Sequence, residues 1–228
     1  MKQLYTLLLL TFISAFTFAQ CDGRYQTEIF SSVTKTTVNY SDVYSDNAHK
    51  MDIYTPDGDT VSNRPVILYL HGGSFYAGDK SNLDCIDFCT SMAKRGYVTA
   101  SVNFRVTNII TFLSSQAEQY TIVLKAVADA KAAVRYFRKD HAINANTYGI
   151  DPSTIFVGGY SSGGVIAIHM AFIDAISDLP TAPIDVQDLV STIGGNLEGD
   201  AGNLGYSSDV QGVISVAGGI NEEPKVCI

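Results

Sequence analysis

The sequence contains no tryptophan and few basic residues: 15 Lys and Arg stand against 23 Asp and Glu, which gives a formal net charge of −8. Proteins that follow a nucleic-acid backbone present a patch of Lys and Arg, and this composition provides none. Motifs such as C-x-x-C or H-E-x-x-H are also absent, so neither a zinc site nor another cofactor is expected. The 228 residues are 46% hydrophobic and 17% charged, which indicates one ordinary globular domain rather than a disordered chain or a coiled coil.

Long apolar runs are missing too, with one exception at the N-terminus. There, a short head containing Lys2 precedes the apolar stretch Leu4–Phe18, and the small residue Ala19 follows where signal peptidase cleaves. A transmembrane anchor is the weaker alternative, because crossing a membrane takes about 20 apolar residues and this stretch is shorter. We expect a signal peptide over residues 1–19, secretion or export to the periplasm, and no membrane insertion after cleavage. The mature domain is then residues 20–228.

Only four cysteines occur: Cys21, Cys85, Cys89 and Cys227. In an exported protein they can form disulfides, and the sequence leaves all three pairings open. Cys21 follows a glutamine, where a lipoprotein signal would have Gly or Ala, so we expect no lipid anchor. Cys85 and Cys89 lie four residues apart on one face of a predicted helix, near the upper limit of disulfide geometry. We expect either two buried core cysteines or one of them paired with a distant partner.

Strand and helix patterns alternate along the chain. Residues 65–70 form a short apolar run that ends in His71-Gly72-Gly73, which is typical of a strand buried on both faces of a parallel sheet. Residues 119–140 repeat apolar side chains at steps of three and four, as an amphipathic helix on a sheet does. The alternation predicts a three-layer α/β domain with a mostly parallel sheet and right-handed crossovers. Strands are expected at 27–42, 50–54, 65–70, 97–104, 154–157 and 212–217, helices at 81–95, 119–140 and 162–176, and a loop at 194–205.

A G-x-S-x-G motif occupies residues 159–163. It falls between a predicted buried strand and a predicted buried helix, where a sharp turn would push Ser161 out at the carboxyl edge of the sheet. Gly159 and Gly163 fit this position because larger side chains in so tight a turn would collide with neighbouring backbone. The N–H of Ser162 begins the following helix, so it can stabilise a negatively charged oxygen. By itself the motif is short, and its placement is what favours a nucleophile over a plain glycine-rich turn.

A second glycine motif, His71-Gly72-Gly73-Ser74-Phe75, directly follows the first buried strand. Backbone N–H groups can donate to an oxyanion only where the chain comes close to the reacting carbonyl, and glycines permit that approach. Gly72, Gly73 and Ser74 are therefore candidate oxyanion donors together with Ser162. The alternative is a turn without chemical function. The two motifs, in this order and each at a strand end, are far more specific together than either is alone.

On these residues the sequence resembles the α/β-hydrolase superfamily. The resemblance is to esterases and lipases with an H-G-G-x oxyanion motif, and within them to secreted carbohydrate esterases of the feruloyl and acetyl-xylan type. It extends over most of the chain from about residue 50 to residue 219. The matching stretches, beyond the two motifs, are Met51–Pro56, Tyr148–Pro152, Ile155–Gly159 and Gly202–Ser208.

The resemblance implies roles for individual positions. Ser161 corresponds to the nucleophile that accepts the acyl group, Ser162 and the Gly72–Ser74 segment to the oxyanion donors, and His71 to a structural residue of the loop. The implied activity is that of a serine esterase (a carboxylic ester hydrolase) that needs no cofactor. Its implied substrate is a small-molecule or carbohydrate ester, such as an acetyl or feruloyl ester.

The triad partners of Ser161 are not evident in the sequence. In this fold the order is Ser, then Asp or Glu, then His, and the single histidine after Ser161 is His169. Eight residues along a helix correspond to a rise of about 12 Å, which is too far for a hydrogen bond. Glu222 and Glu223 follow the last predicted strand and are a weak alternative for the acid. We therefore expect a hydrolase fold that is incomplete at its C-terminus, with the last strands, the acid and the histidine beyond residue 228.

Three functions are compatible with this sequence. The first is the secreted serine esterase, which the ordered motif pair favours. The second is a non-catalytic protein of the same fold that binds a ligand or partner in the pocket, which the missing base favours. A peptidase of this fold is a weaker third, because the chain contains no gating module. The chain as given would be inactive if its base lies downstream, since a serine without a base is a weak nucleophile.

Overall fold

The computed structural model of the protein describes residues 23–219. The predicted signal peptide, Cys21, Cys227 and the two glutamates at 222 and 223 lie outside the described residues. Six strands form one sheet in the order β1-β2-β4-β3-β5-β6. Strands β1, β2 and β4 pair antiparallel, while β4, β3, β5 and β6 pair parallel, so the predicted mostly parallel sheet is confirmed. The strands are β1 Val33–Asn39, β2 Lys50–Pro56, β3 Arg64–Leu70, β4 Val98–Val102, β5 Ile150–Tyr160 and β6 Gly212–Val216.

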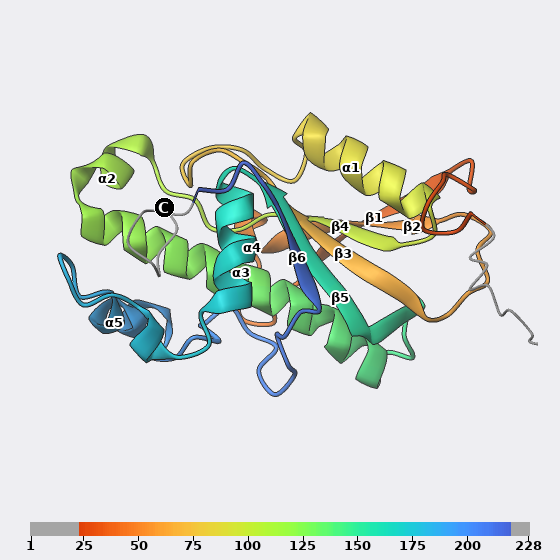
Figure 1. Ribbon diagram of the computed structural model, residues 1–228. Coiled ribbons are helices and arrows are strands. Elements are labelled where there is room, and N and C mark those ends of the chain that lie inside the picture. The colour runs from red at the N-terminus through yellow and green to blue at the C-terminus, as the bar shows by residue number, and fades with distance from the viewer. Residues whose placement is uncertain (1–22, 220–228) are drawn as a thin grey trace, which may run out of the picture.

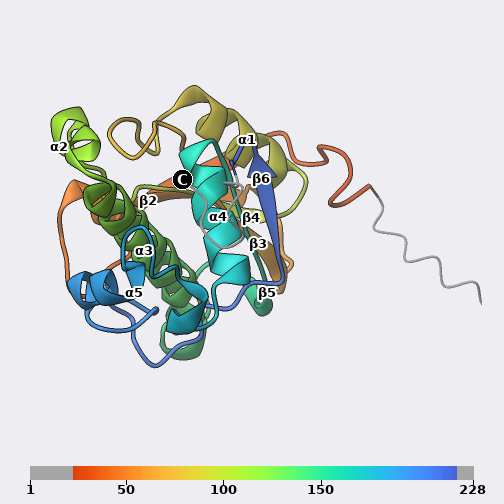
Figure 2. The ribbon, with the colours of Figure 1, turned by 60° about the vertical axis from the view of Figure 1, so that its left-hand side comes forward.

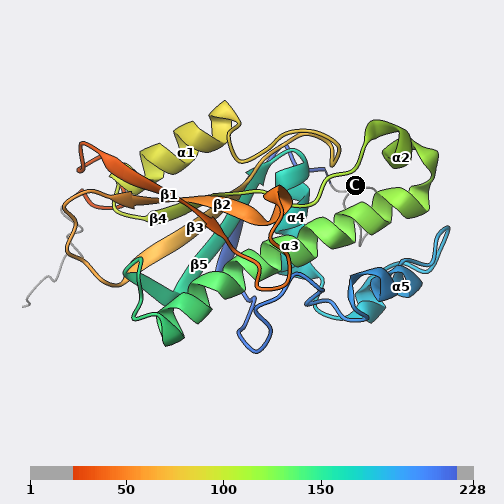
Figure 3. The ribbon, with the colours of Figure 1, turned by 180° about the vertical axis from the view of Figure 1, so that it is seen from behind.

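Helices cover both faces of this sheet. Helix α1 packs on β2, β3 and β4, while α4 packs on β5, β6 and β3 and contacts α3. Figures 1 and 2 show α1 on one side of the sheet and α3 with α4 on the other, and Figure 3 shows α3 running along that second side from behind. The three-layer prediction is therefore confirmed. None of the helices within residues 23–219 combines the length and the apolar character that a membrane span requires. The helices are α1 Leu83–Lys94, α2 Ile109–Ser114, α3 Gln116–Ile143, α4 Ser162–Phe172 and α5 Val186–Leu189, with 3-10 turns at Asn47–His49, Ile176–Asp178 and Val190–Ile193.

The predicted elements exist, but several boundaries were wrong. Helix α3 begins three residues early because Ser115 caps it, accepting a hydrogen bond from the Glu118 N–H at 3.2 Å. The helix expected over 162–176 stops at Phe172, and a separate 3-10 turn follows. The strand expected over 27–42 is shorter, and helices α2 and α5 were not predicted. Both missed helices are only one or two turns long, so their hydrophobic periodicity is too short to detect.

Cys85 and Cys89 lie on the inner face of α1, and both are fully buried free thiols. They pack against Tyr54 and Tyr69 of the sheet, so of the two predicted alternatives the structure shows two core cysteines. Burial is the main cause that raises the pKa of Cys85 to about 12. Neither thiol therefore ionises near neutral pH, and both act as small apolar side chains.

The segment 194–205 is a loop, as predicted, and ion pairs hold it to the rest of the domain. Arg135 on α3 is completely buried, and its guanidinium donates to the carboxylate of Glu198 at 2.6 Å and to the Glu198 carbonyl at 3.1 Å. Arg105 donates to the carboxylate of Asp200 at 2.6 Å. Charge-assisted bonds of this kind are strong in a poorly hydrated site. The hydrogen bonds of Arg135 and Arg105 therefore hold the loop 194–205 against the helical layer that contains α3.

His49 is buried between two carboxylates. Its Nδ1 lies 2.7 Å from Asp46, and its Nε2 lies 3.3 Å from Asp129 on α3. Burial lowers the pKa of the imidazole, but the hydrogen bonds and charges of Asp129 and Asp46 outweigh it, so the net shift is upward. The protonated imidazole is therefore favoured in the folded protein, where it joins the segment before β2 to α3.

This raised pKa predicts a pH-dependent stability. The contribution of His49 is complete below the ordinary histidine pKa of about 6.5 and is lost as the pH rises through the higher folded-state pKa. At pH 5.5 we expect His49→Gln to lower the free energy of unfolding by about 1–3 kcal/mol, and this difference from wild type should shrink by pH 9. Denaturant unfolding across the pH range measures it, with the exposed His141→Gln as control. A difference that stays constant with pH would contradict the assigned protonation.

Candidate active site

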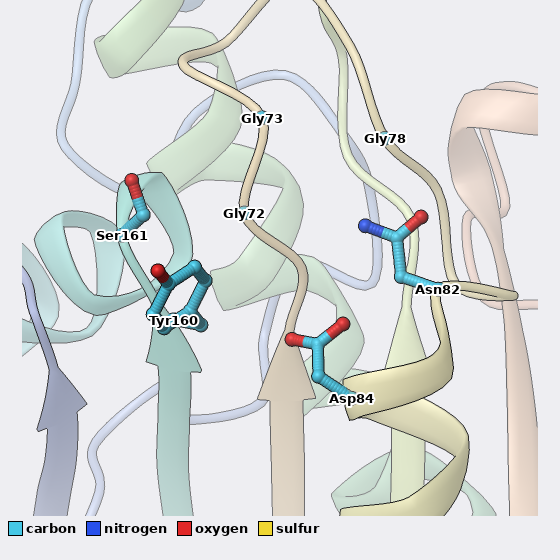
Figure 4. A pocket seen from close by; sticks show the side chains of 7 residues that line it. All are labelled: Gly72, Gly73, Gly78, Asn82, Asp84, Tyr160 and Ser161. Atoms are coloured by element: carbon cyan, nitrogen blue, oxygen red, sulfur yellow. The ribbon is translucent and has the colours of Figure 1, made fainter.

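The turn between β5 and α4 consists of a single residue, Ser161. Its backbone has φ 51° and ψ −116°, a conformation that is strained for any residue other than glycine. Its N–H donates to the carbonyl of Val216 at the end of β6, at 2.8 Å. Figure 4 shows the hydroxyl pointing away from the sheet, beside Gly72 and Gly73. The sharp turn predicted from the motif is therefore present, and it exposes the serine at the carboxyl edge of the sheet.

The two glycines of the motif are required sterically, as predicted. A Cβ on Gly159 would lie 2.5 Å from the backbone carbon of Gly163 and 2.6 Å from the carbonyl oxygen of Leu70. A Cβ on Gly163 would lie 2.6 Å from the carbonyl carbon of Leu70 and still closer to its oxygen. The first turn of α4 thus rests directly on the ends of β5 and β3, with no room for a side chain.

The second glycine motif runs alongside this turn. A Cβ on Gly72 would lie 2.9 Å from the ring of Tyr160 and 3.4 Å from the Cβ of Ser161. Gly73 has φ 134°, and its carbonyl accepts the N–H of Tyr76 and of Ala77 at 3.1 and 3.0 Å. The close approach that oxyanion donors need is therefore present at Gly72, and Gly73 lines the same cavity.

His71 is buried beneath the glycines and shapes the loop. Its Nδ1–H donates to the carbonyl of Gly72 at 2.8 Å, and its ring stacks on Phe104 with centroids 4.2 Å apart. Burial lowers the pKa of His71 more than the hydrogen bond to Gly72 raises it, so the ring is neutral near pH 7. These contacts support the structural role that the resemblance implies for this histidine.

The remaining two predicted donors differ in position. Ser162 is buried and begins α4, and the N–H groups at the start of a helix have no acceptor within the helix. Its amide is therefore available next to Ser161. Ser74 is exposed with φ 52°, and it is not among the residues that line the cavity in front of Ser161. The structure thus places Gly72 and Gly73 in the cavity wall beside Ser161, whereas neither Ser162, the next residue in the chain, nor Ser74 is among the residues that line the cavity.

The cavity in front of Ser161 has a volume of about 520 Å³. Asn82, Asp84 and Tyr160 line it in addition to glycines, and none of the three was predicted as a site residue. Asn82 and Asp84 belong to the start of α1, more than 75 positions before Ser161 in the chain. One signal could have found them: α1 follows β3, so its first turn must lie at the carboxyl edge of the sheet, where ligands of such folds bind. The seven lining residues are Gly72, Gly73, Gly78, Asn82, Asp84, Tyr160 and Ser161.

The histidines of the described part of the chain lie elsewhere. His49 and His71 are held by the contacts given above, His141 is exposed at the end of α3, and His169 is buried two turns along α4, as its spacing predicted. Ser161 Oγ forms no hydrogen bond with any residue between 23 and 219. Within the same residues no cluster of His, Cys, Asp and Glu has the makeup of a metal site. The described part of the site therefore comprises Ser161 and the candidate oxyanion donors.

Comparison with known proteins identifies relatives among esterases. Para-nitrobenzyl esterase of Bacillus subtilis is 30% identical over 122 residues, which is 53% of this chain and 24% of that protein. Carboxylesterase 3B of Mus musculus is 27% identical over 151 residues, 65% of this chain and 25% of that protein. The chain thus spans about a quarter of the length of these curated relatives.

Solved structures share the fold. Thermogutta terrifontis esterase 2 phosphorylated by paraoxon matches with a TM-score of 0.53 and 24% identity, covering 79% of this chain and 56% of that one. A truncated carbohydrate esterase from gut microbiota matches with a TM-score of 0.54 and 24% identity, covering 84% and 57%. These neighbours confirm the α/β-hydrolase fold. The BD-FAE family model matches residues 51–220, well over half of the chain, and so this protein belongs to the BD-FAE family of esterase-like domains.

Proposed function

We propose that the protein is a secreted serine hydrolase of carboxylic esters, with Ser161 as its nucleophile. The observation that carries this proposal is the backbone of Ser161, which is strained and turns the hydroxyl into a cavity walled by Gly72 and Gly73. Strain of this kind persists only where the surrounding structure enforces it, and it is concentrated at functional sites. Membership of an esterase-like family supports the same activity.

In the proposed reaction, Ser161 Oγ attacks the carbonyl carbon of the ester. The Oγ proton passes to a base, and the carbonyl oxygen becomes an oxyanion that accepts hydrogen bonds from the N–H of Ser162 and from the chain at Gly72 and Gly73. The C–O bond to the alcohol then breaks, and the alcohol leaves with the proton from the base. Water hydrolyses the acyl-enzyme in the reverse sense and releases the carboxylic acid. We propose that the base is a histidine outside residues 23–219.

We further propose that the substrates are small acyl esters or carbohydrate-linked esters, such as acetyl and feruloyl esters. The name of one structural neighbour, a carbohydrate esterase, supports this class. The cavity also carries an amide at Asn82 and an aromatic ring at Tyr160, groups that suit a hydroxylated or aromatic ligand.

A fluorophosphonate probe tests the proposal, since it forms a covalent bond with an activated serine. The chain of 228 residues and a version that includes any residues encoded after position 228 would each be incubated with the probe and with p-nitrophenyl acetate. We expect labelling at Ser161, located by peptide mass spectrometry, together with turnover in the form that contains the base. Folded protein that neither labels nor turns over in either form would overturn the proposal and favour the non-catalytic binding protein.

A further inference from the structure

Two side chains of the cavity have no part in the chemistry proposed above: Asp84 from the first turn of α1, and Tyr160, the last residue of β5. Figure 4 shows the Tyr160 ring and the Asp84 carboxylate on either side of the chain that leads from β3 to Gly72. Both therefore lie next to the segment that contacts Ser161. Both also line the cavity in front of Ser161.

No basic side chain of the described part of the protein forms an ion pair with Asp84. Within residues 23–219 its carboxylate forms no ion pair and no side-chain hydrogen bond, in contrast with Asp52, which Lys80 and Lys35 approach to 2.9 and 3.5 Å. The Asp84 charge also acts on a tyrosine of β3 that packs beneath α1. Burial and then the Asp84 carboxylate raise the pKa of Tyr69, near the carboxyl end of β3, to about 12. A carboxylate in the first turn of α1, with no basic side chain paired to it among residues 23–219, thus lines the site.

Tyr160 supplies an aromatic surface in the same cavity. Its residue is 47% exposed although it ends a central strand, so much of the ring is in contact with the cavity rather than with the core. The face of an aromatic ring attracts cations, and a nearby carboxylate strengthens that attraction. An anionic group of a ligand bound in this cavity would instead be repelled by Asp84. It would also gain no attraction to the face of the Tyr160 ring.

We infer that Asp84 and Tyr160 form a subsite beside Ser161 that accepts a positively charged group of the ester and disfavours a negatively charged one. The inference rests on the proposed function, because it names the substrate class of the same site. Asp84 contributes the charge, and Tyr160 contributes the surface on which the cationic group lies.

Three aryl acetates that differ only in the group at the meta position test the inference. They are 3-acetoxyphenyltrimethylammonium, its neutral isostere 3-tert-butylphenyl acetate, and the anionic 3-acetoxybenzoate. The measured quantity is the ratio of kcat/KM for the cationic ester to kcat/KM for the anionic ester, in the form of the protein that is active. We expect Asp84→Asn to lower this ratio by about fivefold, an effect typical of one solvent-exposed charge pair. The effect should shrink in 0.5 M salt, because screening weakens such pairs.

Asp87→Asn is the matched control. Asp87 is also exposed on α1 and its substitution removes the same charge, but it does not line the cavity. It should leave the ratio within twofold of wild type. Tyr160→Leu should lower kcat/KM for the cationic ester relative to its tert-butyl isostere, because leucine offers no aromatic face.

A binding measurement separates this inference from the proposed function. The product 3-hydroxyphenyltrimethylammonium would be titrated into Ser161→Ala protein, with and without Asp84→Asn, and followed by NMR. We expect the Kd to rise about fivefold on Asp84→Asn. Hydrolysis with no change in the charge ratio would overturn the subsite and leave the esterase intact. Binding that depends on Asp84 without any hydrolysis would overturn the esterase and leave the subsite. Absence of both would overturn both.

Discussion

Ester turnover by the active form is expected to fall at least about 1,000-fold when Ser161 is replaced by alanine, and covalent labelling by a fluorophosphonate should vanish. The reason is that the acyl-enzyme cannot form without Oγ. The oxyanion donors around Gly72 and Ser162 remain and can give only residual catalysis. Hydrolysis of p-nitrophenyl acetate measures the loss, with Ser81→Ala, an exposed serine outside the cavity wall, as the control.

The same position offers a test that does not depend on activity. Ser161→Ala keeps the strained backbone, whereas Ser161→Gly relieves it, because glycine adopts a φ of 51° without a Cβ clash. We expect the glycine variant to be more stable to denaturant than the alanine variant by about 1–3 kcal/mol. Equal stabilities would show that the turn is not strained, and the main observation behind the proposed nucleophile would be lost. Turnover that persists in both variants would assign the chemistry to another residue.

Gly163→Ala is expected to destabilise the fold by about 3 kcal/mol or more, or to prevent folding. At an ordinary helical position the same change would stabilise the protein by up to about 1 kcal/mol, since alanine is the better helix former. Here the new Cβ would come within 2.6 Å of the carbonyl carbon of Leu70, and a backbone group at the end of β3 cannot move aside. Whether Gly163→Ala stabilises or destabilises the protein therefore tests the close contact between α4 and the sheet. Urea unfolding followed by circular dichroism measures it.

Gly212→Ala in β6 is the control for that experiment. A Cβ at Gly212 would meet only the ring of Phe156, at 3.4 and 3.5 Å, which is ordinary van der Waals contact. We expect a change of less than about 1 kcal/mol at this position. If Gly163→Ala were neutral or stabilising, the helix would have to sit farther from β3 than it does here, and the geometry of the site would be wrong with it.

Much of the site could be predicted because its constraints are local. The turn at Ser161 needs Gly159 and Gly163 within two residues on either side, and the approach at Gly72 needs glycines directly after a buried strand. Each of these requirements involves only a few consecutive residues, so a sequence pattern can predict it.

The sequence by itself determined the α/β class, the order of its main strands and helices and the turn that exposes Ser161. Only the tertiary structure decided that Asp84 of α1 lines the cavity in front of Ser161. It also decided that Arg135 of α3 binds Glu198 and so holds the loop 194–205. These contacts join positions more than 60 residues apart. They depend on which strands become neighbours in the sheet, and that order follows from the burial of whole layers, which no short segment of the sequence specifies.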